Sequence, residues 1–493
     1  MAIGLVAELL VYTHSFFWQI RRGLAGFSLI ISAIGAGMFA VQTQNAFGAS
    51  LAFLMIYRVI NCLRLVDNRV NEEYLKRVTT RTFCYLAGAQ IIILVSMLSL
   101  YKFTLSFDPK IVYVTTAVTL LFASVIVMIS TTLNIKSTKL KVKRNLQPKD
   151  TPTVTLAIAA RNEDFNLQEC LDLAVNSDYP KLEIIVLDDC SQDKTAQIIK
   201  DFAQHGVRFV QSSTLDNTWL AKNKAYETLL QQASGDVMMF MGVDARLGVT
   251  TISQLLEALT NKHVDMLSVM PERTASGVVA AFVQPMRYWW ELAIPRKLLK
   301  RPPVLSTCWL IKRRVLLKMG GFKAVTHAII PEEHLARELS KKNKYAFGRS
   351  NSVIGLTTQK DFADQWDTAV RTRYPQLHRR PELAALRSIL MLVFLLLPFI
   401  AFFASLFLVS IPNTCIYLYG LSSLFLVASH LMITASTNKE AVLLSVFNFP
   451  IIALLDLAAL HISMYRYEFG EVVWKGRNVS TPVMHIVSHL PPI

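Results

Sequence analysis

The sequence predicts an α/β domain with a mostly parallel sheet, inserted between membrane helices at both ends of the chain. The 493 residues are 53% hydrophobic and 17% charged, which is more apolar than an ordinary soluble domain. Uncharged stretches long enough to cross a bilayer occur only toward the two ends. Between about Thr151 and Glu382, short β-branched runs alternate with amphipathic segments, which is typical of strands joined by crossover helices.

Composition also excludes several classes of protein. A disordered chain, a small disulfide scaffold and a purely soluble enzyme would not combine this length with this apolar content. The six cysteines lie far apart with no CxxC pair, so the sequence favours neither a thiolate zinc site nor a disulfide framework, and it is compatible with a reducing cytoplasm.

The N-terminal region, residues 1–147, contains about four predicted spans. Residues 23–57 carry no charge and are interrupted by polar residues at 42–45, which predicts two helices joined by a tight turn. Residues 82–101 and 111–135 are also uncharged, and each reaches the length of about 20 residues that a membrane helix needs.

The C-terminal region, residues 386–493, contains two or three further spans and a basic tail. Residues 388–438 are uncharged and predict two helices. The last apolar stretch, residues 441–465, contains Pro450 and Asp456. A third full crossing would place the basic tail outside the cell, so we expect this stretch to lie in the interface or to re-enter.

Basic residues indicate the orientation of the helices. They gather at Arg21-Arg22, at residues 64–81 and at residues 136–149. These clusters stand before the first span, between the second and the third, and after the fourth. By the positive-inside rule these three clusters are cytoplasmic. We therefore expect a multipass protein of the bacterial cell membrane whose central domain, residues 148–385, lies in the cytoplasm. The net charge of +16 then indicates contact with membrane lipids, and we expect no nucleic acid as partner.

Acidic side chains follow the predicted strands of the central domain. Strands are expected at residues 154–160, 182–187, 207–211 and 237–241, and helices at 166–175, from Asp193 onward and at 221–232. Ligands of such sheets bind at the carboxyl ends of the strands. That edge is where Glu163, Asp188, Asp189 and Asp244 fall.

Five motifs follow one another in this domain. They are Ala160-Arg161-Asn162-Glu163; the run from Leu187-Asp188-Asp189 to Thr195; Trp219 to Ala225, with Lys222; Gly235-Asp236 to Asp244; and Gly320-Gly321-Phe322 with Pro331-Glu332-Glu333. As an ordered series over residues 150–380, they resemble the nucleotide-sugar half of membrane-bound family-2 glycosyltransferases, which have the GT-A fold.

The resemblance implies a site for a nucleotide-sugar donor. Glu163 and Asp189, with Asp188 beside them, are the candidates to accept hydrogen bonds from the ribose or the base, and Lys222 is expected near the diphosphate. Asp188 and Asp189 have an alternative role as caps of the next helix. The sequence leaves this alternative open.

Asp244 is the candidate metal ligand. The family carries Asp-x-Asp at this place, whereas this chain reads Gly242-Val243-Asp244, so the first carboxylate is missing. The resemblance implies Mg²⁺ or Mn²⁺ held by Asp244, phosphate oxygens and water. A plain loop residue is the alternative for Asp244.

The resemblance also implies an inverting transfer with one general base. The family has its base in a Glu-Asp pair at a helix start, and this chain has Glu332-Glu333. Glu333 is the expected base, with Glu332 or His334 as substitutes. The alternative is that both glutamates only favour the positive end of the helix dipole.

Processive polymerases of the family carry Gln-x-x-Arg-Trp, and this chain reads Val370-Arg371-Thr372-Arg373-Tyr374. Arg373 is the expected diphosphate contact, with Arg371 as an alternative, and both could instead be ordinary juxtamembrane residues. The missing glutamine argues against an enzyme that threads a polymer.

Two segments indicate membrane contact. Residues 278–301 mix Tyr288-Trp289-Trp290 with basic residues, which predicts an interfacial helix, although burial of these aromatics is nearly as well supported. Trp474-Lys475-Gly476-Arg477 resembles a segment at the end of some membrane glycosyltransferases.

Together these expectations describe transfer of one sugar, from a UDP-sugar ahead of a GDP-sugar, to a lipid-linked or membrane-proximal glycan acceptor in cell-envelope synthesis. A processive polysaccharide synthase is the alternative within the enzyme class. A non-catalytic, nucleotide-sugar-binding membrane protein is the alternative outside it, because the Asp-x-Asp and Glu-Asp motifs are both altered.

Overall fold

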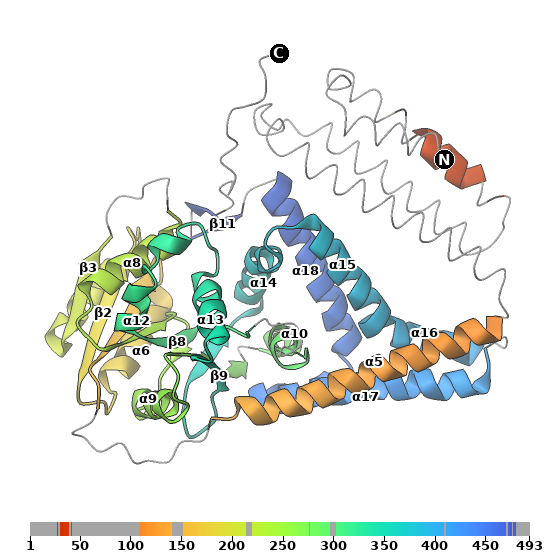
Figure 1. Ribbon diagram of the computed structural model, residues 1–493. Coiled ribbons are helices and arrows are strands. Elements are labelled where there is room, and N and C mark those ends of the chain that lie inside the picture. Colours follow the sequence, from red (N-terminus) through yellow and green to blue (C-terminus); the bar gives the residue numbers. More distant parts are fainter. Residues whose placement is uncertain are drawn as a thin grey trace.

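A computed structural model gives the fold of the chain (Figure 1). It describes residues 27, 30–38, 41, 109–140, 151–212, 219–275, 277–295, 302–408, 411–469, 472–475 and 477–479. The predicted spans at 82–101 and, apart from the few positions just given, at 23–57 lie outside the described residues.

A seven-stranded sheet in the order β3-β2-β1-β4-β8-β6-β9 forms the centre of the α/β domain. Its strands are β1 (Val154–Ala160), β2 (Leu182–Asp188), β3 (Val207–Gln211), β4 (Val237–Met241), β6 (Met266–Met270), β8 (Cys308–Lys312) and β9 (Tyr345–Arg349). All neighbours pair in parallel except β8, which is antiparallel to β4 and β6. The structure thus confirms the mostly parallel α/β class, and the arrangement is that of the GT-A fold.

Helices cover both faces of this sheet. They are α6 (Asp164–Val175), α7 (Thr195–Asp201), α8 (Ala221–Gln232), α9 (Thr251–Asn261), α12 (Arg313–Lys318) and α13 (Pro331–Lys341). One apolar core joins the sheet to α6, α7 and α9, and a second joins it to α8, α12 and α13. The central strands are apolar throughout because both of their faces are buried. Strands β1, β3 and β4 and helix α8 have the predicted bounds.

A smaller sheet lies beside the carboxyl end of β4. It consists of β5 (Ala245–Arg246), β10 (Thr357–Lys360) and β7 (Glu272–Ala275), with β10 in the middle. Because β5 begins directly after Asp244, this sheet brings the end of β10 to the same place as the predicted acidic cluster.

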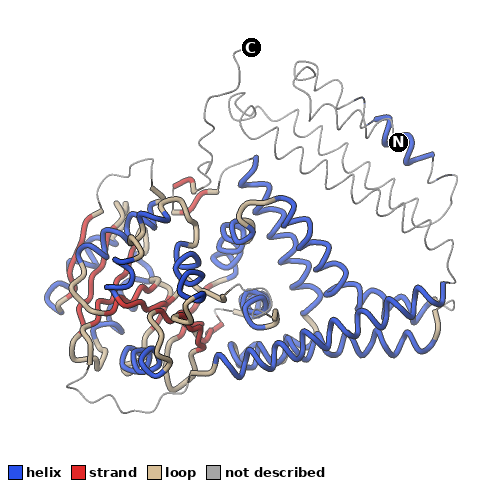
Figure 2. Tube along the Cα trace, in the orientation of Figure 1, coloured by secondary structure: helices blue, strands red, loops and turns tan. Residues whose placement is uncertain are grey.

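Five long apolar helices form the described part of the membrane region (Figures 1 and 2). They are α5 (Pro109–Thr138), α15 (Pro381–Met391), α16 (Leu397–Phe407), α17 (Asn413–Thr437) and α18 (Phe449–Phe469). Within the described residues, four helical stretches are long and apolar enough to cross a bilayer: Lys110–Thr138, Leu383–Phe407, Asn413–Thr437 and Phe449–Glu468. The Leu383–Phe407 stretch joins α15 to α16 through a π-helical turn at Leu392–Leu396.

Where the sequence predicts an interfacial or re-entrant segment around Pro450 and Asp456, the structure has the helix α18. It is continuous over 21 residues, because Pro450 falls in its first turn, where a proline costs no hydrogen bond. A re-entrant break is therefore not observed. In Figure 1, α18 and α15 lie side by side at a marked angle to the pair formed by α5 and α17. Its passage across a bilayer stays a prediction.

Helices α10 (Val278–Leu292) and α14 (Phe362–Thr372) lie between the α/β domain and the membrane helices. Tyr288 and Trp289 of α10 are only 1% and 2% exposed. Trp289 packs against Phe449 of α18, with ring centroids 5.8 Å apart. These two aromatics are buried inside the protein, which is the alternative that the sequence left open.

Candidate active site

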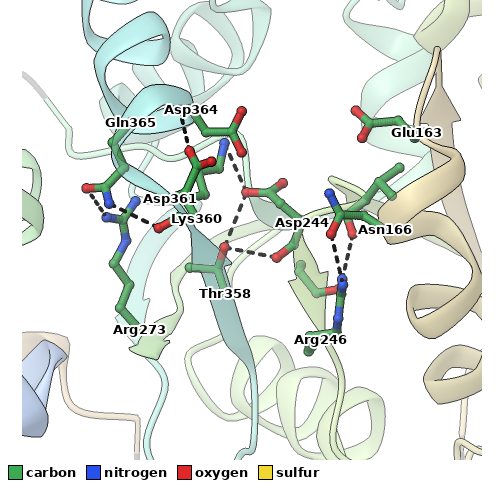
Figure 3. A network of polar contacts seen from close by, with 12 residues as sticks. Glu163, Asn166, Asp244, Arg246, Arg273, Thr358, Lys360, Asp361, Asp364 and Gln365 are labelled. Atoms are coloured by element: carbon green, nitrogen blue, oxygen red, sulfur yellow. Dashed lines mark hydrogen bonds and ion pairs between the residues drawn. The ribbon is translucent and has the colours of Figure 1, made fainter. Parts of the chain in front are cut away.

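Neighbouring parallel strands bring two acidic side chains to one edge of the sheet. Strands β1 and β4 pair in parallel, and Glu163 and Asp244 each follow their strand by three residues. In Figure 3, Glu163 lies across from Asp244 at this edge. The predicted meeting of these two carboxylates at the strand ends is thus observed.

Asp244 is held by the smaller sheet. Its Oδ2 lies 3.1 Å from Nζ of Lys360 and accepts a hydrogen bond of 3.2 Å from the hydroxyl of Thr358 (Figure 3). Its Oδ1 lies against Gly242, where an added Cβ would come within 2.5 Å. The glycine that replaces the family's first aspartate therefore leaves room for the carboxylate of Asp244.

Glu163 is held by a hairpin from the far end of the chain. This hairpin consists of β11 (Val473–Trp474) and β12 (Arg477–Asn478). Lys475 lies in its turn and places Nζ 3.2 Å from Oε1 of Glu163, and Arg161 donates from Nε to the carbonyl oxygen of Lys475 over 2.8 Å. Burial raises the pKa of Glu163 above its ordinary value; Lys475 opposes this shift and Asp244 adds to it.

Asp188 and Asp189 are buried at the end of β2. Asp188 accepts hydrogen bonds from the backbone N–H of Ser191 at 3.3 Å and the side chain of Gln211 at 3.3 Å. The carbonyl oxygen of Asp189 accepts a 2.5 Å hydrogen bond from Arg161. In this structure Asp188 shapes the turn after β2 and does not cap α7, whose N-cap position is Lys194 with no side-chain cap hydrogen bond.

Glu332 lies inside the domain, at the start of α13. It is completely buried, and its carboxylate oxygens lie 3.4 Å from Nζ of Lys222. The hydroxyl of Ser306 donates to the same carboxylate. Nζ of Lys222 also lies 5.2 Å from the ring centre of Tyr226. Burial lowers the pKa of Lys222, while Glu332 opposes that shift.

Glu333 points elsewhere, since consecutive helical residues are about 100° apart. Its Oε1 forms an ion pair of 3.1 Å with Arg337, one turn further along α13. Arg337 is also within 3.3 Å of His378. Glu332, the substitute in the family pattern, is thus the glutamate that pairs with Lys222. The role of Glu333 as the base stays a prediction.

Arg371 and Arg373, at the end of α14, also have different partners. Arg373 directly follows the helix and forms an ion pair of 2.5 Å with Asp456 of α18. Arg371 lies on the donor side, where its guanidinium stacks over Trp474 at 4.6 Å. Burial lowers the pKa of Arg371, and Asp244 and Glu163 are near enough to oppose that shift.

A cavity of about 80 Å³ lies between α14 and α18. Helix α14 lines it with Gln365 and Thr372, and α18 lines it with Ile452 and Leu455. Ser306, which donates to Glu332, lines it as well. Arg373 and Asp456 line it too, so the wall formed by α18 is mainly apolar but carries one carboxylate. The cavity adjoins the buried carboxylate of Glu332 through Ser306.

The donor set for a metal ion is small. Among the described residues, no group of three or more His, Cys, Asp or Glu side chains is placed to hold a metal ion. Asp244 is 25% exposed at its side chain and offers hard carboxylate oxygen. These residues fit a divalent cation only when a diphosphate and water supply the other ligands.

Sequence reasoning missed Lys360 and left Lys475 without a role. Lys360 ends a short edge strand and carries no motif, so no sequence signal marks it. Lys475 lies in the Trp-Lys-Gly-Arg segment, which the sequence did single out. Its contact with Glu163 spans 312 positions of the chain, a pairing that one sequence alone does not reveal.

Comparison with known proteins assigns the α/β domain. Residues 155–320 match the family model "Glycosyl transferase family 2". The probable glycosyltransferase YdaM of Bacillus subtilis is 27% identical over 184 residues, which cover 35% of this chain and 44% of YdaM. Glycosyltransferase AglE of Haloferax volcanii is 31% identical over 113 residues, covering 21% of this chain and 36% of AglE. The chain thus spans less than half of the length of these relatives.

Among solved structures, the mannosyltransferase PcManGT of Pyrobaculum calidifontis, in complex with GDP-Man and Mn²⁺, superposes with a TM-score of 0.42 at 17% identity. The superposition covers 72% of this chain and 98% of that protein. The family match, the ordered motifs and the sheet with its one antiparallel strand agree with one another. The α/β domain is that of a family-2 glycosyltransferase, by the match over residues 155–320.

Proposed function

We propose that this chain transfers a sugar from a nucleoside-diphosphate sugar to an acceptor at the membrane surface. The observation that carries the proposal is the gathering of acidic and basic groups at the carboxyl ends of β1 and β4. Asp244 pairs with Lys360, Arg371 lies near both Glu163 and Asp244, and Lys222 lies near Arg371 and pairs with Glu332. Carboxylates suit ribose and base donors, and ammonium and guanidinium groups suit a diphosphate.

The acceptor is proposed to enter through the cavity between α14 and α18. Its apolar wall belongs to an apolar helix, and its polar wall carries amides and hydroxyls. Such a cavity suits a lipid-linked or membrane-proximal glycan, whose hydroxyl needs polar partners while its anchor stays in lipid. Two relatives in Staphylococcus carry the names poly(ribitol-phosphate) β-N-acetylglucosaminyltransferase and poly-β-1,6-N-acetyl-D-glucosamine synthase. By analogy, we propose a role in cell-envelope glycan synthesis.

Glu332, rather than Glu333, is proposed as the general base. It is the glutamate beside the cavity, through Ser306, and beside Lys222. A diphosphate would draw the ammonium of Lys222 toward itself and so leave Glu332 more basic. The acceptor hydroxyl, losing its proton to Glu332, attacks the anomeric carbon opposite the departing diphosphate, which inverts that centre.

Mg²⁺ or Mn²⁺ is proposed as the cofactor, with Asp244 as its protein ligand. The ion would neutralise charge that develops on the leaving diphosphate. Asp244 must exchange its ion pair with Lys360 for this contact, and Lys360 then remains beside the phosphates. A UDP-sugar is proposed ahead of a GDP-sugar, and the multipass position in a bacterial cell membrane with a cytoplasmic domain stays a prediction.

A transfer assay with the full chain tests the function. Protein purified in detergent would be supplied with UDP- and GDP-sugars, Mg²⁺ or Mn²⁺, and bacterial membrane lipids, and the products would be identified by mass spectrometry. Addition of one sugar to a lipid-extractable acceptor is expected. A ladder of many sugars would indicate the processive alternative. Nucleotide binding without turnover, under every donor, would indicate a non-catalytic protein.

Donor affinity is expected to fall as the pH is lowered from neutral. Because the pKa of Glu163 is raised from 4.5, this carboxyl takes up its proton at a higher pH than an ordinary glutamate and then no longer accepts the ribose hydroxyls. The measurement is the Kd of UDP by titration calorimetry across a pH series. Glu163→Gln should bind more weakly and show a flat profile over the same range. An equally steep profile in Glu163→Gln would assign the pH dependence to another group.

A further inference from the structure

An acidic side chain is buried in the apolar helix α18. Asp456 is 6% exposed within a helix that is otherwise long and apolar enough to cross a bilayer. A charged group in such a helix costs free energy unless it is paired, so its retention indicates a role. Asp456 lines the cavity proposed for the acceptor, but the reaction proposed above gives it no chemical step.

Asp456 joins four elements. Its Oδ1 pairs with Arg373 at 2.5 Å and its Oδ2 pairs with Arg387 of α15 at 3.1 Å. The same Oδ2 accepts a hydrogen bond of 2.8 Å from the indole of Trp290 in α10, and the guanidinium of Arg387 stacks on that indole at 4.2 Å. One carboxylate therefore holds two arginines that are 7% and 13% exposed at their side chains.

Two further residues on the same face of α18 form hydrogen bonds with the end of α14. Ser463, seven residues after Asp456, accepts a hydrogen bond of 3.1 Å from the backbone N–H of Tyr374. Tyr467, four residues later, donates from its hydroxyl to the carbonyl oxygen of Arg371 at 2.8 Å. Residues four and seven apart share one helix face. Of these three contacts, only the one with Asp456 is an ion pair.

These contacts of α18 with the end of α14 determine which of the two arginines lies near Glu163 and Asp244. Arg371 and Arg373 are two positions apart and so point in nearly opposite directions, about 200° around the helix. With Arg373 drawn to Asp456, Arg371 stacks over Trp474, whose neighbour Lys475 pairs with Glu163. Without the carboxylate, two buried guanidiniums would lose the acceptor that they share and would repel each other, and the end of α14 would have to move.

We propose that Asp456 is a positioning residue for the donor site. By its ion pair with Arg373, it fixes the rotation of α14 about its axis, and this rotation presents Arg371 to the diphosphate. The inference rests on the proposed function, since it assumes a nucleoside-diphosphate donor. It links the orientation of an apolar membrane-region helix to donor affinity, at a distance from the reacting atoms.

The test measures the Kd of UDP and of GDP for the full chain in detergent, together with the thermal midpoint of each variant. Asp456→Asn is expected to weaken the tighter of the two nucleotides about tenfold, the loss expected when one charge-assisted hydrogen bond is misplaced. Asp456→Glu keeps the charge and should restore most of the affinity. Asp201→Asn is the matched control, since it makes the same chemical change at an exposed side chain of α7, on neither α14 nor α18; its Kd should stay within about twofold of wild type.

A double-mutant cycle separates positioning from general destabilisation. Arg371→Gln alone should weaken the nucleotide about 10- to 100-fold, and adding Asp456→Asn to it should change Kd by less than about twofold, because the arginine through which Asp456 acts is gone. A lowered thermal midpoint with unchanged Kd in Asp456→Asn would overturn the inference, as would an undiminished effect in the Arg371→Gln background. Wild-type protein that binds neither nucleotide would overturn the proposed function, and this inference with it.

Discussion

Replacing Glu332 by glutamine is expected to lower kcat about 10²- to 10⁴-fold, the usual contribution of a general base. Glutamine keeps the size of the side chain and its hydrogen bond with Ser306, but it cannot take a proton from the acceptor hydroxyl. The Kd of the donor nucleotide should change little, because the base acts on the acceptor. Steady-state transfer rates together with nucleotide titrations give both quantities.

Glu333→Gln is the matched control for this result. Its carboxylate is 11% exposed and pairs with Arg337, one turn further along α13, rather than with Lys222. Glutamine keeps the size of this side chain and its hydrogen-bond acceptor. We expect this variant to keep kcat within a few-fold of wild type. If it instead shows the larger loss, the base is the residue that the family pattern favours, and α13 must rotate when substrates bind.

Replacing Asp244 by asparagine is expected to reduce turnover on the order of 100- to 1000-fold, because stabilisation of the leaving diphosphate by a metal ion is worth several kcal/mol. The variant should also lose most of the response of donor binding to added Mn²⁺. Initial rates and nucleotide titrations over a metal series measure both effects.

The control is Asp201→Asn, the same chemical change at an exposed side chain on α7 that accepts a hydrogen bond from Gln197. It should behave as wild type. Full turnover by Asp244→Asn with an unchanged metal response would show that Asp244 is only a loop residue, and Lys360 would then have to be tested as the group that neutralises the diphosphate.

Four strands of the central sheet, β1 to β4, could be predicted from the sequence because they are short and mainly apolar, whereas β6, β8 and β9 were not predicted. Turn residues bound the four predicted runs, which favours strands over a buried helix. The structure therefore has β1 and β4, and the acidic residues after them, where the sequence predicts them. The aromatics of α10 could not be placed, because a bilayer interface and a protein core select the same side chains. The domain boundaries at 147–148 and 385–386 stay predictions.

The finer features of the site depend on contacts that one sequence does not contain. Two consecutive glutamates at a helix start carry no sign of which one faces inward, because the phase of α13 is set by packing against the sheet. The choice between Arg371 and Arg373 depends on Asp456, more than 80 positions away. Sequence patterns therefore identified the residue types of the site but not the direction in which each side chain points.

The contact between Lys475 and Glu163 has a consequence for biosynthesis. Glu163 is translated early, right after the first strand of the domain, whereas Lys475 leaves the ribosome only after α18, the last of the apolar helices. The α/β domain can thus form its sheet while the chain is still growing, whereas the ion pair that holds Glu163 forms only after α18 has been synthesised.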